Sequence, residues 1–420
     1  MPPRSARSLD EWLRLQETLN PRAIELGLDR VRAVASRLGL PAAGPHTLTV
    51  AGTNGKGSSA ALAAAVYRAG GYHVGLYTSP HVLRYNERVQ IDGQMVSDDA
   101  LCEAFEAIDA VRGDIPLTYF EFGTLAALWL FRAARVDVQV LEIGLGGRLD
   151  AANLVDADVA LLTNVGLDHQ DWLGNDREQI GTEKAGIFRA GRPAVIVERE
   201  PPQSVLDAAA RLGALPLRLG TDFDYVVLPD GSWSWRYRGE TWTRLPPPAL
   251  AGDVQYQNAA GVFAAVQAGL QRQPVRRDAC ERGLALLRLR GRCESYRGVL
   301  LDVAHNVEAA QVLADFLRQR PQPCALVLGM LADKPAGAVG RLLAGVADPI
   351  LAVGLPGPRG LSADALQARL AEAGVDSRTC DNIADALHEA RAAVGSQGCV
   401  AATGSFLTVA AAINELDAHG

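Results

Sequence analysis

Short apolar runs alternate with helical patterns along most of the chain. In the first half, such runs predict buried strands, and a helix at 59–69 is predicted directly after the first of them. These strands are expected at residues 48–51, 74–78, 136–143, 159–163 and 194–197. Strands that alternate with helices in this way are typical of parallel sheets covered by helices on both faces. The pattern therefore predicts an α/β protein.

An aromatic-rich segment at residues 223–243 interrupts this alternation. A Pro-Asp-Gly-Ser turn at 229–232 lies between its tyrosines and tryptophans, which predicts a β-hairpin. Helices are predicted after it, at 256–270 and 275–287.

A second α/β series begins near residue 295. Its strands are predicted at 299–303, 324–328, 350–353 and 399–402, and its helices include 362–373 and 383–394. We place the domain boundary in the arginine-rich segment 289–295. This gives an N-terminal domain at 1–291 and a C-terminal domain at 292–420. The triple proline at 246–248 is the alternative boundary.

Composition narrows the class of protein. Of the 420 residues, 48% are hydrophobic and 21% are charged, which excludes a largely disordered chain. The net charge is −7, whereas proteins that bind nucleic-acid duplexes usually carry a basic surface. A small anion can still be bound by backbone N–H groups. None of the six cysteines forms a C-x-x-C pair, so neither a zinc site nor a disulfide framework is indicated. Because no secretory signal or membrane-spanning run is found, we expect a cytoplasmic protein that binds neither nucleic acid nor membranes.

The strongest candidate for chemistry is the glycine-rich segment 51–58, which follows a predicted strand and opens a helix. Glycine-rich backbone can turn its N–H groups toward a phosphate, and the helix N-terminus adds partial positive charge. Lys56 supplies a mobile cation, and Ser58 offers a hydroxyl to phosphate or Mg²⁺. The glycines, Lys56 and Ser58 are more tightly spaced than the corresponding residues of the standard P-loop motif, and Gly57 is inserted before Ser58. A helix-capping turn with an incidental lysine is the plainer alternative.

Polar residues follow two further predicted strands. Glu142 ends an apolar strand, where open α/β sheets place ligand sites, and a carboxylate there suits Mg²⁺. A solvated glutamate would also explain it. Asp168 and His169 follow the next strand, and this segment leaves open whether His169 binds metal or is structural. Spacing alone gives Lys184 no special role.

Six segments together resemble the folylpolyglutamate synthase/dihydrofolate synthase family, relatives of the Mur ligases. They occur in one order, at 51–58, 78–81, 142–150, 168–174, 183–188 and 302–306. The resemblance implies an ATP-dependent amide ligase. Its fold would be a Mur-ligase-like P-loop domain with a parallel sheet, followed by a Rossmann-like α/β domain at the C-terminus.

The resemblance also implies roles for individual residues. Catalytic roles fall on Lys56, His169 and Lys184. The ATP-binding residues would be Gly52, Thr53, Asn54, Gly55, Lys56, Gly57, Ser58, Asn258, Arg292, Asp302 and His305. The metal ligands would be Ser79, Glu142, His169 and Lys184. The substrate-binding residues would be Ala23, Ile24, Glu25, Leu26, Thr118, Tyr119, Phe120, Glu121, Leu149, Asp150 and Ala151, of which those at 24–26 and 118–121 resemble dihydropteroate-binding segments.

The implied reaction joins L-glutamate to dihydropteroate and to tetrahydrofolate (poly)glutamates in folate biosynthesis. The acceptor carboxylate would take the γ-phosphate of ATP to form an acyl phosphate, which the glutamate amine then attacks. Two Mg²⁺ ions are expected, with Lys184 carbamylated to supply an oxygen ligand. We expect a monomer. The alternatives are a Mur-type ligase that acts on a nucleotide-linked peptide and a nucleotide-binding regulator without catalysis.

Overall fold

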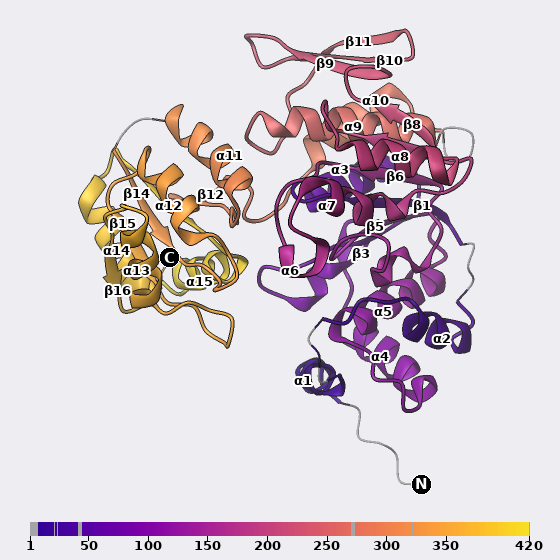
Figure 1. Cartoon of the computed structure of the whole chain (residues 1–420), viewed down its shortest axis with the longest axis horizontal. Coiled ribbons are helices and arrows are strands. Elements are labelled where there is room, and N and C mark those ends of the chain that lie inside the picture. The colour runs from indigo at the N-terminus through magenta and orange to yellow at the C-terminus, as the bar shows by residue number, and fades with distance from the viewer. Residues whose placement is uncertain are drawn as a thin grey trace. The chain divides into compact units, whose positions relative to one another are not determined.

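The chain folds into two compact units in a computed structural model, which describes residues 7–20, 22, 24–40, 44–269, 274–320 and 323–419 (Figure 1). Unit 1 comprises Met1–Ala249 and Tyr256–Leu287, and unit 2 comprises Leu250–Gln255 and Arg288–Gly420. The functional boundary expected at 291/292 stays a prediction. No helix of the described residues is long and apolar enough to cross a membrane.

Unit 1 is built on an eight-stranded sheet with the order β4-β3-β2-β5-β1-β6-β7-β8. The six neighbouring strands β2-β5-β1-β6-β7-β8 pair in parallel. Strands β3 and β4 extend the sheet beyond β2 and pair in antiparallel fashion. Their bounds are β1 His46–Ala51, β2 Val74–Tyr77, β3 Val89–Ile91, β4 Gln94–Met95, β5 Val138–Glu142, β6 Val159–Leu162, β7 Pro193–Ile196 and β8 Leu215–Arg218. The five strands predicted in this half are confirmed. Parallel strands place the loops that follow β1, β5, β6 and β7 at one edge.

The helices of unit 1 bury apolar faces against this sheet and against one another. Their bounds are α1 Leu9–Leu19, α2 Asp29–Arg37, α3 Lys56–Ala69, α4 Asp98–Arg112, α5 Tyr119–Ala134, α6 Gln170–Leu173, α7 Arg177–Lys184, α8 Gln203–Leu212, α9 Val254–Ala268 and α10 Arg277–Leu286. Short 3-10 turns lie at Tyr85–Arg88, Ala151–Leu154 and Ala185–Ile187. Helix α5 is fixed at its start by a capping box, in which Thr118 and Glu121 satisfy each other's backbone N–H groups.

The aromatic segment forms three antiparallel strands, ordered β11-β10-β9, and not the single hairpin predicted. These are β9 Phe223–Val227, β10 Trp233–Tyr237 and β11 Glu240–Leu245. Trp233 and Trp235 lie two residues apart in β10 and therefore share one face of the sheet. Both rings pack on Phe263 of α9, at centroid distances of 5.5 and 5.8 Å. The small sheet is thereby attached to unit 1 through an aromatic cluster.

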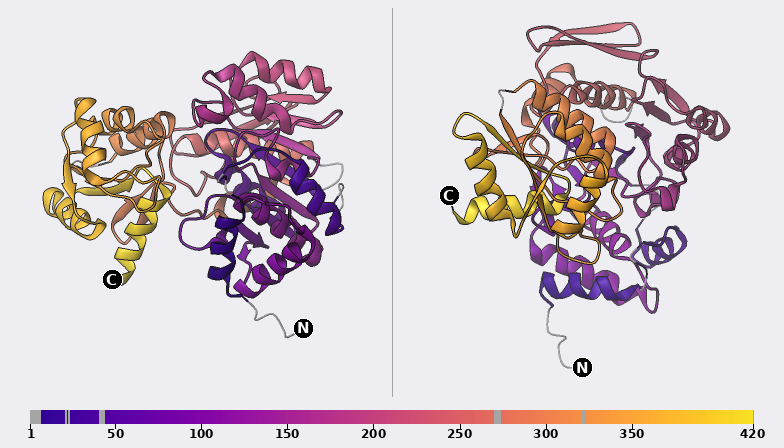
Figure 2. Two further views of the ribbon diagram at one scale, coloured as in Figure 1. Left: turned by 60° about the horizontal axis from the view of Figure 1, so that its bottom comes forward. Right: turned by 60° about the vertical axis from the view of Figure 1, so that its left-hand side comes forward.

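Unit 2 contains a six-stranded sheet with the order β12-β13-β17-β14-β15-β16. Its strands are β12 Glu294–Tyr296, β13 Val299–Leu301, β14 Cys324–Leu328, β15 Ile350–Val353, β16 Arg378–Cys380 and β17 Cys399–Thr403. Its helices are α11 Val307–Arg318, α12 Ala336–Ala344, α13 Ala363–Glu372, α14 Ile383–Val394 and α15 Phe406–Ala418. All strands but β12 pair in parallel. Figure 2 shows these helices around the sheet, and the α/β architecture predicted for this part is confirmed.

Candidate active site

The glycine-rich loop Gly52–Ser58 follows β1 and leads into α3. Gly52 and Gly55 adopt positive φ angles of 150° and 80°, which glycine adopts without the strain of a side chain. A Cβ at Gly52 would lie 1.8 Å from Thr163 Oγ1, and a Cβ at Gly55 would lie 2.9 Å from Asn258 Oδ1. Both neighbours thus require the bare glycine backbone. Asn258 of α9, predicted to contact ATP, therefore lies directly against the loop.

Lys56 is the first residue of α3 and folds back over the loop. Its Nζ donates to the carbonyls of Gly52 at 3.1 Å and Thr53 at 3.2 Å. The ammonium group thus lies beside backbone at the start of a helix, where an anion is favoured by the helix dipole. This arrangement can hold the phosphates of a nucleotide.

The loop after β6 is hydrogen-bonded to the glycine-rich loop. Thr53 N–H donates to Asn164 O at 3.0 Å, and Asn54 N–H donates to Asn164 Oδ1 at 2.9 Å. His169 lies farther along the same loop, in the left-handed region with a φ of 52°, and precedes α6. Its Nε2 lies 3.9 Å from Asp168 Oδ2. The loop therefore connects the candidate phosphate site to the candidate metal ligand His169.

Two more of the predicted metal ligands, Glu142 and Lys184, are buried beside the glycine-rich loop. Glu142, at the end of β5, accepts a hydrogen bond from Ser79 N–H at 3.0 Å. A Cβ at Gly57 would lie 3.5 Å from both carboxylate oxygens of Glu142, so the acid lies against the first turn of α3. Lys184, the last residue of α7, donates from Nζ to Gly52 O at 2.9 Å.

These residues fit an oxygen-ligated cation. Glu142 offers a buried carboxylate beside the glycine-rich loop Gly52–Ser58, which we call the phosphate loop, and the backbone of Ser79 binds this carboxylate. Carboxylate and hydroxyl oxygens, such as those of Glu142 and Ser79, are ligand types that Mg²⁺ accepts. No group of three His, Cys, Asp or Glu side chains suited to a metal occurs among the described residues. Of the predicted set, only Glu142 and His169 are of these types, and the other two members are Ser79 and Lys184.

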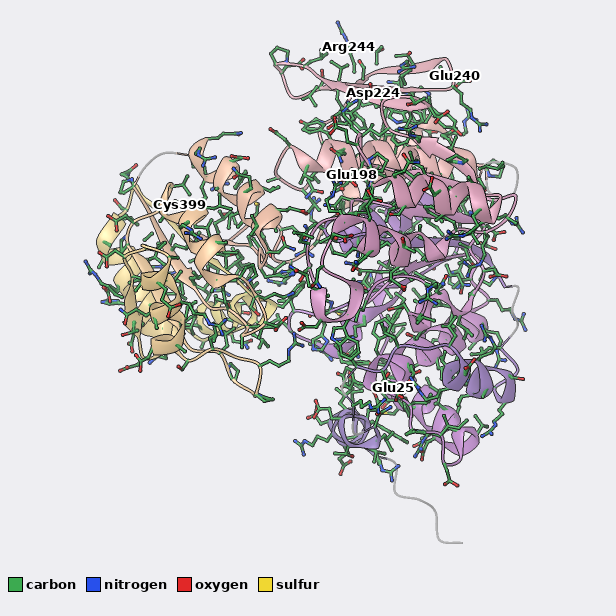
Figure 3. All side chains as sticks on the ribbon, viewed as in Figure 1. Glu25, Glu198, Asp224, Glu240, Arg244 and Cys399 are labelled. Carbon is green, nitrogen blue, oxygen red and sulfur yellow. The ribbon has the colours of Figure 1, made fainter. Side chains whose placement is uncertain are left out.

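The predicted substrate segments lie together. Gly27 N–H donates to Leu149 O at 3.1 Å, which joins the 24–27 segment to the loop after β5. Arg30 links two of the acids, with Nη1 3.1 Å from Glu25 Oε1 and Nη2 3.1 Å from Glu121 Oε1. Figure 3 labels Glu25 in this region. Ala23 lies outside the described residues.

The aromatic ring of Phe120 completes this contact. A Cβ at Gly144 would lie 2.6 Å from Phe120 Cζ, so the glycine lets the ring approach the loop after β5. Thr118 and Glu121 are buried, and Tyr119 and Phe120 are partly buried at the start of α5. The segments at 24–26, 118–121 and 149–151 thus form one candidate substrate site.

Asp150 is a buried carboxyl group of this candidate substrate site. Its carboxylate accepts hydrogen bonds from Leu145 N–H at 2.8 Å and Ala152 N–H at 2.9 Å. Burial raises the pKa of Asp150 to about 7, while these hydrogen bonds and the charge of Lys56 act to lower it. The loop that carries Asp150 also packs on the end of α7: Arg148 N–H donates to Glu183 O at 2.9 Å, and a Cβ at Gly147 would lie 2.7 Å from Lys184 O.

Comparison with known proteins identifies the family. Residues 50–213 match the Mur ligase middle domain, and residues 288–406 match the Mur ligase glutamate ligase domain. The dihydrofolate synthase/folylpolyglutamate synthase of Escherichia coli (strain K12) is 44% identical over 99% of this chain and 97% of its own length. The chain belongs to the dihydrofolate synthase/folylpolyglutamate synthase family. The predicted family, the Mur-ligase-like fold and the ATP-dependent ligase class are therefore confirmed.

Two solved structures of this family are similar over nearly the whole chain. Escherichia coli FolC in complex with DHPP and ADP has a TM-score of 0.92 and 42% identity, and the match covers 99% of each chain. A bifunctional folylpolyglutamate synthase/dihydrofolate synthase with Mn, AMPPNP and L-glutamate bound has a TM-score of 0.91 and 42% identity, with 99% of this chain and 100% of that chain covered.

The remaining predicted nucleotide contacts of this family member belong to unit 2, where Arg292 precedes β12 and Asp302 and His305 follow β13. Asp302 accepts hydrogen bonds from Cys293 N–H at 2.9 Å and Ala304 N–H at 2.8 Å. Its burial raises its pKa, and the charge of Arg292 acts in the opposite direction. His305 Nδ1 lies 2.8 Å from Val303 O. Arg292, Asp302 and His305 thus form a group of their own, while Asn258 lies with the phosphate loop in unit 1.

Sequence reasoning missed three side chains that organise the site of this ligase. Arg30 joins the acids of the substrate segments, and Arg177 and Glu198 bind the loop after β6. Glu198 follows the strand predicted at 194–197, so the strand-end rule that selected Glu142 could also have selected it. The two arginines carried no comparable signal, because each acts through contacts distant in sequence.

Proposed function

We propose that this enzyme joins L-glutamate to dihydropteroate, forming dihydrofolate, and to tetrahydrofolate (poly)glutamates, with ATP as the energy source. The observation that carries the proposal is a chain of contacts from the candidate substrate site to the glycine-rich loop. The loop after β5, which carries Leu149 and Asp150, places Gly147 against the backbone of Lys184, and Lys184 Nζ donates to Gly52 O at 2.9 Å. A carboxylate bound in the first site can thus meet a γ-phosphate bound in the second. The names and bound ligands of the family members described above support the same substrates.

The reaction needs an activated carboxylate, because a free carboxylate is a poor electrophile. An oxygen of the acceptor carboxylate attacks the γ-phosphorus, ADP leaves, and an acyl phosphate forms. The glutamate amine then attacks the acyl carbon and phosphate leaves. Lys56 and the loop N–H groups spread the charge on the transferred phosphoryl group, a reaction governed mostly by positioning and electrostatics.

We assign the metal ligands to Ser79, Glu142, His169 and Lys184. When bound, Mg²⁺ neutralises charge on the phosphate oxygens. Lys184 fits a carbamate because its Nζ is buried beside Gly52 O, and addition of CO₂ would turn a cation into an oxygen ligand. Two ions require such a bridging group, since Glu142 is the one carboxylate in the assigned set.

We further propose that ATP is contacted by Asn258 and, from the C-terminal domain, by Arg292, Asp302 and His305. The functional domains would be residues 1–291 and 292–420. We also propose that the protein is a cytoplasmic monomer. The six cysteines are free thiols, as expected in a reducing compartment.

The deciding experiment is release of ADP by the purified protein with ATP, Mg²⁺ and L-glutamate, with dihydropteroate or tetrahydrofolate as the acceptor. Release that requires both glutamate and acceptor, for both acceptors, is the expected result. Release with tetrahydrofolate alone would retire the assignment of the 24–26 and 118–121 segments to dihydropteroate. No release with either acceptor would overturn the proposal and direct the search to Mur-type substrates or a non-catalytic role.

A further inference from the structure

One residue of the loop after β6, Val165, is held at both of its backbone polar groups by an ion pair. Glu198, which follows β7, accepts the Val165 N–H through Oε2 at 3.1 Å. Arg177, the first residue of α7, donates from Nε to Val165 O at 2.8 Å. The two side chains bind each other, with Arg177 Nη2 2.5 Å from Glu198 Oε1. We call Arg177 and Glu198 the loop clamp.

The opposite side of the same loop is bound to the phosphate loop. Thr163 Oγ1 donates to Asn54 O at 2.6 Å, and Asn164 Oδ1 accepts from Asn54 N–H at 2.9 Å. Gly166 N–H donates to Thr53 Oγ1 at 2.9 Å. Residues 163–166 therefore lie between the phosphate loop and the loop clamp, and a shift on one side is transmitted to the other.

The loop clamp also connects the two assigned metal ligands that lie on different segments. His169 follows Val165 on the clamped loop, and Lys184 ends the helix that Arg177 begins. Arg177 and Glu198 are 45% and 21% exposed at their side chains, so their mutual attraction alone contributes little stability. Their effect is instead to fix the geometry of the loop, because the planar guanidinium of Arg177 can bind a carbonyl and a carboxylate at once.

We propose that Arg177 and Glu198 are positioning residues, which fix the phosphate loop, His169 and Lys184 at the spacing that Mg²⁺-nucleotide requires. The inference rests on the proposed function for the identity of the metal ligands. The clamp acts on these groups through the backbone of Val165. Its loss should therefore weaken the response to Mg²⁺ more than it weakens folding. Supporting partners of metal ligands change metal affinity about 10–100-fold when they are removed.

The test compares Glu198→Gln and Arg177→Lys with a matched control. Glutamine can still accept from Val165 N–H but has no charge for Arg177, and lysine cannot bridge two acceptors in fixed directions. Asp224→Asn is the control, because Asp224 forms a similar pair with Arg199 at 2.6 Å. That pair does not involve the clamped loop. Figure 3 labels both Glu198 and Asp224.

Two quantities are measured for each variant: the Mg²⁺ concentration for half-maximal turnover, and the Mg²⁺ dependence of ADP binding by calorimetry. In the two clamp variants we expect the Mg²⁺ concentration for half-maximal turnover to rise about 10-fold and the Mg²⁺ dependence of ADP binding to weaken by a similar factor. Asp224→Asn should match the wild type, and all melting temperatures should stay within a few degrees of each other. If one clamp variant does not fold, the other still decides. Mg²⁺ dependences equal to the control in a folded clamp variant would overturn the proposal.

The same measurements separate this inference from the proposed function. A wild-type protein that binds ADP with Mg²⁺ but ligates neither acceptor would contradict the proposed function alone. A weakened Mg²⁺ dependence of ADP binding in the clamp variants would then still support the loop clamp. If the wild type is fully active and the Mg²⁺ dependences of the clamp variants equal those of the control, the loop clamp is overturned and the proposed function stays in place.

Discussion

Thr53 and Gly166 bind each other through both backbone groups of the glycine. Gly166 N–H donates to Thr53 Oγ1 at 2.9 Å, and the same hydroxyl donates to Gly166 O at 3.1 Å. A single hydroxyl thus joins the loop after β1 to the loop after β6. The phosphate loop and the segment that leads to His169 therefore form one connected unit, and this connection can be tested.

Thr53→Val keeps the shape of the side chain and removes both hydrogen bonds. Because it leaves a partly buried N–H and carbonyl without this partner, we expect a loss of about 1–3 kcal/mol in the free energy of unfolding. ADP binding should weaken as well. Urea unfolding and calorimetry measure the two effects. Thr53→Ser keeps the hydroxyl and is the matched control. Equal stability and affinity in the valine and serine variants would show that the connection has no energetic role.

Most strands of the two large sheets and the glycine-rich loop could be predicted because their signals are local, whereas the short strands β3, β4, β8, β12 and β16 were missed. An apolar run followed by glycines and a small-residue helix specifies the strand, loop and helix of β1 and α3 within one segment. The third strand of the small sheet was missed for a local reason too. The turn before β11 uses Arg238 and Gly239 at positive φ angles of 47° and 89°. Such turns usually carry Asn-Gly or Asp-Gly, so Arg-Gly gave no turn signal.

The connections of the candidate site could not be predicted in the same way. Arg30 reaches Glu121 across 91 positions of the chain, and Thr53 reaches Gly166 across 113. Neither pair has a sequence spacing that a helix or strand would bring together. Family resemblance supplied the individual residues, but the contacts among them depend on which loops the sheet order places side by side.

Gly144→Ala tests the packing between the substrate segments. A Cβ at Gly144 would lie 2.6 Å from Phe120 Cζ, so the ring must move. Overpacking of this kind costs about 1–3 kcal/mol. We also expect the KM for dihydropteroate to rise while the KM for ATP stays near the wild-type value. Steady-state kinetics and thermal unfolding measure these effects.

The matched control for this change is Gly345→Ala in unit 2. The nearest atom to a Cβ there is Leu342 O at 3.5 Å, an ordinary contact, and its φ of −72° suits alanine. This variant should be neutral. Adding Phe120→Leu to Gly144→Ala should restore part of the lost stability, because the shorter side chain leaves room for the methyl group. No recovery in the double variant would contradict the predicted clash.

Asp150 should make stability depend on pH in the nucleotide-free protein. Burial raises its pKa from 3.8 to about 7 in the folded state. Between these values the folded chain holds a proton that the unfolded chain has released, so stability falls as pH rises toward 7 and then levels off. The unfolding free energy of the wild type minus that of Asp150→Asn should therefore decrease by about 2 kcal/mol from pH 5 to pH 7. Urea unfolding across this range measures it, and a constant difference would contradict the raised pKa.

Lys184 separates nucleotide binding from ligation. Its Nζ is buried and donates to Gly52 O, so a small side chain there removes one hydrogen bond to the phosphate loop and leaves the loop residues themselves unchanged. We expect Lys184→Ala and Lys184→Arg both to lose ligation, the second because a guanidinium keeps the charge but cannot form the carbamate that would bind Mg²⁺. ADP affinity, measured by calorimetry, should fall only modestly in either variant and serves as the internal control for folding.

Added bicarbonate should raise the turnover of CO₂-depleted wild type and leave both variants unchanged. Unchanged turnover in Lys184→Arg would show that the ammonium charge, and not a carbamate, is what the reaction needs.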